Sequence, residues 1–127
     1  MKFTKYNANP QGKKTGDCTI RAIAFATNQS WYEVLNDLYA IGVEECLCPL
    51  GVDSIIIYLK NFELQTPKAV KGKKRPKVKD YTKGTWILRT ANHLTCVKDN
   101  VNYDTWDCRE RCVYRAWKIE KIKKRKK

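Results

Sequence analysis

The sequence predicts an α+β protein whose helices come first and whose strands follow. Between residues 17 and 59, apolar residues recur at helical spacing in three separate stretches. Between residues 85 and 117, short runs rich in β-branched and aromatic residues alternate with turn formers. The chain has 127 residues, of which 43% are hydrophobic, and this suits a single domain. Because helices and strands are segregated along the chain, we expect N-terminal helices packed on a C-terminal antiparallel sheet.

The first predicted helix follows Gly16, where the chain can turn sharply. Asp17 is the expected N-cap, Cys18 lies in the first turn, and Asn28 is the expected terminator. The residues between are almost all apolar, which predicts a buried helix.

Two further helices are expected before the sheet. Ser30 and Glu33 have the spacing of a capping box, and the apolar stripe after them ends at Gly42 or soon after. Turn formers in residues 49–53 then precede a short helix with Asp53 as its cap.

Five strands are predicted from β-forming composition, at 62–65, 85–90, 93–97, 101–106 and 112–117. A two-residue turn at Asp99 and Asn100 would join the third of these to the fourth and place Lys98 opposite Val101. This register fixes which side chains share a face of the sheet.

Positive charge is concentrated in two segments, a basic loop at 68–83 and a basic tail at 118–127. Their net charges of +7 and +6 account for the whole +13 of the chain, so the domain at 1–117 is otherwise neutral. Such runs can be mobile and solubilising, or can attract nucleic acid or an acidic partner in a salt-dependent way.

Three residues have the types that thiol catalysis requires. Cys18 at a helix start would have a lowered pKa, and His93 is the only histidine available as a base. In the expected hairpin register, Asp104 shares a face with His93 and lies diagonal to it, whereas Asp107 has the wrong parity and Asp99 sits in the turn. Each of the three taken alone also fits a structural role, and it is their combination that predicts a site.

The segments that carry these residues resemble a known family. Gly16-Asp17-Cys18-Thr19-Ile20-Arg21, Asn92-His93-Leu94-Thr95-Cys96-Val97 and Tyr103-Asp104-Thr105-Trp106-Asp107 look like segments of small uncharacterised proteins of bacteriophages and Gram-positive bacteria. The layout of these proteins is similar to that of papain-like cysteine peptidases. The resemblance extends from about residue 7 to 117 and omits the basic loop and tail.

The resemblance implies a papain-like fold and a hydrolase, peptidase or amidase, that acts through a thioester. Cys18 would be the nucleophile, His93 the general base and then acid, and Asp104 the residue that orients His93. The Cys18 amide and one upstream side chain would form the oxyanion hole. Gln11 is the expected donor, with Asn7 and Asn9 as competitors.

Other functional classes receive less support from the sequence. A zinc site could be formed by four thiolates, from the pair Cys46 and Cys48 and the pair Cys108 and Cys112. Neither pair has the Cys-x2-Cys spacing of common zinc sites, so we expect reduced thiols, no metal and no cofactor. Cys96 should face the core.

No apolar run is long enough for a membrane span, and no apolar run follows Met1 as in a signal peptide. We therefore expect a cytoplasmic monomer, in the host bacterium if the protein is phage-encoded, with a protein or peptide as substrate. The alternative is a non-catalytic protein that binds nucleic acid or an acidic host partner through the basic loop and tail.

Overall fold

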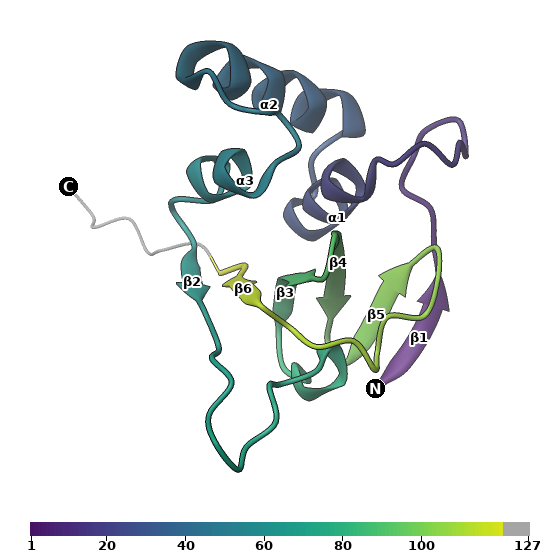
Figure 1. The fold of residues 1–127 in the computed structure, drawn as a ribbon. Helices are drawn as coiled ribbons and strands as arrows, with labels where there is room; N and C mark the ends of the chain where they lie inside the picture. The colour runs from purple at the N-terminus through teal and green to yellow at the C-terminus, as the bar shows by residue number, and fades with distance from the viewer. Residues whose placement is uncertain (121–127) are drawn as a thin grey trace, which may run out of the picture.

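A computed structural model describes residues 1–120 and shows three helices on one side of a six-stranded sheet (Figure 1). This confirms the α+β class. Seven of the ten residues in the basic tail lie outside the described range. The helices are α1 (Cys18–Thr27), α2 (Trp31–Glu45) and α3 (Val52–Tyr58), and the strands are β1 (Lys2–Lys5), β2 (Glu63–Gln65), β3 (Thr85–Thr90), β4 (His93–Lys98), β5 (Val101–Asp104) and β6 (Arg115–Lys118).

The sheet has the strand order β1-β5-β4-β3-β6-β2 and is mixed rather than wholly antiparallel. β1 pairs parallel with β5 along one edge, while every other pair is antiparallel. The expectation of a purely antiparallel sheet was wrong because β1 was missed. Its four residues are mostly exposed and polar, so they lack the apolar alternation by which a strand is recognised.

The hairpin between β4 and β5 has the predicted register. Lys98 pairs with Val101, and Asp99 and Asn100 both have positive φ angles, as a type I′ turn requires. Because this turn is tight, it fixes the positions of His93 and Asp104 on neighbouring strands.

The helix ends agree with the predictions in part. Asn28 ends α1 in the left-handed conformation, and the Ser30 hydroxyl accepts a hydrogen bond from the Glu33 backbone N–H at 3.0 Å. Asp17 is the N-cap residue of α1, but its carboxylate makes no capping bond. The N-cap of α3 is Gly51 rather than Asp53, which lies in the first turn.

The second helix continues past Gly42 to Glu45 because Gly42 serves packing rather than termination. A Cβ atom at this position would lie 2.9 Å from the Leu47 carbonyl oxygen and 3.0 Å from Pro49 Cγ. The absence of a side chain therefore lets the returning chain pass close to the helix.

Apolar side chains are buried on both faces of the sheet. The three helices cover one face, where α1 supplies Ile20 and Ile23 and the sheet supplies Cys96 and Trp117. Cys96 packs in this core, as its strand parity predicted. None of the described helices has the length and apolar character of a bilayer span, and the longest, α2, has 15 residues.

The second half of the basic loop is packed against the body of the protein, which corrects the simple picture of a mobile charged run. Val78 is fully buried in a small core on the sheet face away from the helices. Its backbone N–H donates to the Arg111 carbonyl at 3.0 Å, and Val113 N–H donates to the Pro76 carbonyl at 2.8 Å. Burial of the Val78 side chain therefore holds this segment against the protein, although its highly charged composition predicts that it is exposed to solvent.

Candidate active site

Cys18 is the first residue of α1, next to the free backbone amides of the helix start. Its thiol is half-buried and faces the His93 imidazole and the Leu94 backbone N–H. Burial acts to raise the pKa of this thiol, but the interactions with His93, Leu94 and Arg21 outweigh burial and lower it. A lowered thiol pKa favours the nucleophilic thiolate.

His93 begins β4 and is oriented by Asp104 at the end of β5. The imidazole Nε2 lies 2.7 Å from Asp104 Oδ2, and both side chains are largely buried. Burial lowers the pKa of His93, but hydrogen bonds with Asp104, Cys108 and Cys18 raise it to about 11. The pKa of the Asp104 carboxyl is lowered to about 2, because hydrogen bonds with His93, Thr95 and Thr105 and the charge of His93 outweigh its burial. The pair therefore carries an imidazolium and a carboxylate at neutral pH.

Asp104 is held by the backbone and by α1 as well as by His93. The Thr105 backbone N–H donates to Asp104 Oδ1 at 2.7 Å, and Arg21 Nη1 donates to the same oxygen at 3.3 Å. One carboxylate oxygen therefore faces His93 while the other is fixed from the opposite side, which restricts rotation of the carboxylate.

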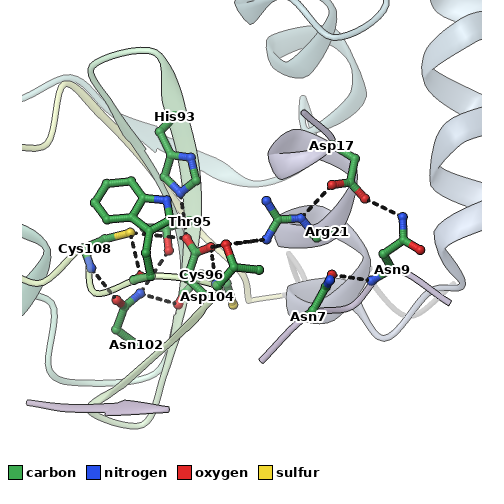
Figure 2. A network of polar contacts seen from close by, with 12 residues as sticks. Asn7, Asn9, Asp17, Arg21, His93, Thr95, Cys96, Asn102, Asp104 and Cys108 are labelled. Carbon is green, nitrogen blue, oxygen red and sulfur yellow. Dashed lines mark hydrogen bonds and ion pairs between the residues drawn. The ribbon is translucent and has the colours of Figure 1, made fainter. Parts of the chain in front are cut away.

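Arg21 was not assigned a role from the sequence, and it connects the helix to the sheet. Figure 2 shows its guanidinium between Asp17 and Asp104. Its Nε donates to Asp17 Oδ1 at 2.8 Å, and the second oxygen of Asp17 accepts from Asn9 Nδ2 and from Trp31 Nε1. The i,i+4 spacing of Asp17 and Arg21 could have indicated their ion pair from the sequence. The contact between Arg21 and Asp104 spans 83 positions, and no sequence pattern indicates it.

A buried polar network supports the sheet side of the site. Asn102 is fully buried, and its amide donates to Thr95 Oγ1 at 2.9 Å and accepts from the Cys108 backbone N–H at 3.1 Å. The Cys108 thiol in turn donates to Asp104 Oδ2 at 3.3 Å (Figure 2). Burial raises the pKa of Cys108, so this second thiol stays protonated beside the site.

The side-chain atoms of His93, Asp104 and Cys108 that could bind a metal ion lie within 4.8 Å of one another, and their types suit zinc. Their actual contacts are those of a hydrogen-bonded network, with Arg21 adding positive charge beside Asp104. The four cysteines Cys46, Cys48, Cys108 and Cys112 do not gather into a metal-sized cluster among residues 1–120, where the group of that size that contains Cys108 consists of His93, Asp104 and Cys108.

Trp106 covers one side of His93, with the two ring centroids 4.8 Å apart. Its own indole is 38% exposed and lies under the Arg111 guanidinium. Trp106 therefore stands between the imidazole and solvent.

The pocket beside Cys18 is narrow, with a volume of about 10 Å³, and Tyr6, Ala8, Arg21 and Phe25 are among its walls. None of the three expected oxyanion donors lines it. Gln11 is exposed and lines a separate hollow, Asn9 donates to Asp17, and Asn7 donates to the Lys13 carbonyl at 3.2 Å. The Gln11 assignment therefore gains no support, and the free backbone amides at the start of α1 are the remaining candidates for the oxyanion hole.

Comparisons with known proteins give no independent assignment. A scan of family models, a search of curated proteins and a search of solved structures found no match to this chain. The function has to be inferred from the chemistry of the site.

Proposed function

We propose that this protein is a cysteine hydrolase or acyltransferase with a papain-like arrangement, in which Cys18, His93 and Asp104 cleave an amide bond through a thioester. One observation carries the proposal: the same imidazole faces a helix-start thiol and, at 2.7 Å, a buried carboxylate. Nucleophile, base and orienting group are thereby in the order that thiol catalysis needs.

In the proposed reaction, the Cys18 thiolate attacks the carbonyl carbon and forms a tetrahedral oxyanion next to the amides of the α1 start. When the C–N bond breaks, protonated His93 gives its proton to the leaving amine and a thioester remains on Cys18. Water then loses a proton to His93 and adds to the thioester, which releases the acid and restores the thiolate. Asp104 keeps its charge throughout and holds the imidazole in place.

Protein or peptide amides are the substrates that we propose for this reaction, in the cytoplasm. A peptide can present an amide carbonyl along a surface cleft, and the narrowness of the pocket at Cys18 argues against a bulky rigid substrate.

The test is to trap the acyl-enzyme with an activated ester. Wild-type protein treated with p-nitrophenyl acetate should release a burst of nitrophenolate and carry an acetyl group on Cys18, located by peptide mapping. Cys18→Ala and His93→Ala should lose both signals. Cys46→Ala, which removes an exposed thiol, should keep both. Equal acetylation of Cys18 and Cys46 in the wild type would reject the proposal.

A second candidate rests on the exposed first half of the basic loop. Lys68, Lys71, Lys73 and Lys74 are all exposed and have no acidic partner among the described residues. We propose that this segment attracts an anionic partner such as nucleic acid. Binding should weaken steeply with added salt and be unchanged by Cys18→Ala.

A further inference from the structure

Two arginines face each other on adjacent strands close to the candidate site. Arg89 on β3 is the direct cross-strand partner of Arg115 on β6. Directly opposed residues have Cβ atoms about 5 Å apart, and like charges in this position destabilise a sheet. An anion bound between the two guanidinium groups would relieve this repulsion.

The described part of the chain supplies no such anion. Neither guanidinium makes an ion pair or a side-chain hydrogen bond with any residue from 1 to 120. The Nε atom of Arg115 is buried and has no hydrogen-bond partner. A buried N–H without an acceptor is rare in folded proteins, so the described residues leave the half-buried Arg115 guanidinium incompletely satisfied.

The arginine pair lies near the candidate nucleophile, on the sheet face that carries Leu94 and is covered by the helices. Arg89 pairs with Leu94 across β3 and β4, and the Leu94 backbone N–H faces the Cys18 sulfur. Since neighbouring strands are about 4.8 Å apart, the row from Leu94 through Arg89 to Arg115 extends about 10 Å from the site. That distance is a few residues of extended peptide.

We propose that Arg89 and Arg115 form a subsite for a carboxylate of the substrate, so that the preferred substrate is a peptide with an acidic side chain or a free C-terminus near the bond attacked by Cys18. This inference rests on the proposed function, because it defines which substrates reach that thiol. Planar guanidinium groups bind carboxylates through paired hydrogen bonds, and two arginines from neighbouring strands can share one carboxylate.

The test compares two thiol reagents that differ only in charge: maleimidopropionic acid and its neutral amide. Rates of modification at Cys18 are measured in the full chain by site-resolved mass spectrometry, with exposed Cys46 as the internal reference. Wild-type Cys18 should favour the acid over the amide about tenfold more than Cys46 does. Arg89→Gln with Arg115→Gln should lose this preference and react normally with the neutral amide. Lys71→Gln with Lys73→Gln, which removes the same charge from the basic loop, should keep it.

A second measurement on the wild type covers the case in which the arginine variants do not fold. At constant ionic strength, glutarate should slow the acidic reagent at Cys18 and leave its rate at Cys46 unchanged. Equal protection by inorganic phosphate, or no protection by either anion, would overturn the carboxylate assignment. The carboxylate assignment would also be overturned if Cys18 still preferred the acidic reagent in the variant that carries both arginine substitutions. If His93→Ala leaves the rate of the neutral amide at Cys18 unchanged, then it is the proposed function that fails.

Discussion

At the scale of single residues, the chemistry depends on how protons are distributed among Cys18, His93 and Asp104. The pKa of Cys18 is lowered, that of His93 is raised to about 11 and that of Asp104 is lowered to about 2. Between the pKa of Cys18 and that of His93, the site therefore holds a thiolate, an imidazolium and a carboxylate. The imidazolium stabilises the thiolate, and the carboxylate stabilises the imidazolium.

Replacing Asp104 by Asn should remove the charge that stabilises the His93 imidazolium. The pKa of His93 then falls, the thiolate of Cys18 loses its counter-ion, and acylation of Cys18 at neutral pH should slow by about a hundredfold. The measurement is the rate of nitrophenolate release. Asp107→Asn is the matched control, because Asp107 is exposed and pairs with Arg109 rather than with the imidazole. Equal rates in the two variants would remove Asp104 from the site.

The two buried cysteines should be inert in the folded protein. Burial raises the pKa of Cys96 to about 12 and also raises that of Cys108, so neither presents a thiolate at neutral pH. Brief treatment with iodoacetamide should label Cys18 first, the exposed thiols more slowly, and Cys96 and Cys108 only after denaturant is added. Labelling of Cys108 before the exposed Cys112 would contradict this assignment of charge states.

At the scale of elements, Arg21 ties α1, which carries the nucleophile, to β5, which ends in Asp104. Arg21→Met should leave the buried Asp17 carboxylate without its cation and Asp104 with His93 as its remaining cation, and should lower the free energy of unfolding by about 3 kcal/mol, measured by urea titration. Arg21→Lys keeps the positive charge and should recover part of the lost stability. It should not recover all of it, because lysine lacks the planar guanidinium group that contacts both carboxylates. A Met variant as stable as the wild type would show that the ion pairs do not hold α1 on the sheet.

The β4–β5 hairpin was predictable from the sequence because its determinants are local. Asp99 and Asn100 favour the positive φ angles of a two-residue turn, and strand alternation then places Asp104 beside His93. By contrast, β1 and the Arg21–Asp104 contact depend on residues far apart in the chain. Neither a polar edge strand nor an ion pair across 83 positions leaves a periodic signal in the sequence.

At the scale of the whole molecule, the basic loop is divided into an exposed first half and an anchored second half. Val78 is fully buried, whereas Val70 is 58% exposed. Val78→Ala should therefore lower the free energy of unfolding by about 2 kcal/mol, and Val70→Ala should change it by less than about 0.5 kcal/mol. Thermal unfolding of the two variants checks this, and equal stabilities would mean that the loop is not anchored through Val78.

The central claim is that His93 activates Cys18, and alkylation of the folded protein as a function of pH tests it most directly. With a lowered thiol pKa, the rate of iodoacetamide modification at Cys18 should begin to fall at a lower pH than that of a free thiol of pKa roughly 8.5, which slows about tenfold per pH unit below its pKa. In His93→Ala, Cys18 should follow the free-thiol profile. If wild-type Cys18 already follows that profile, or if His93→Ala leaves the profile unchanged, the account of this site as a catalytic triad is wrong.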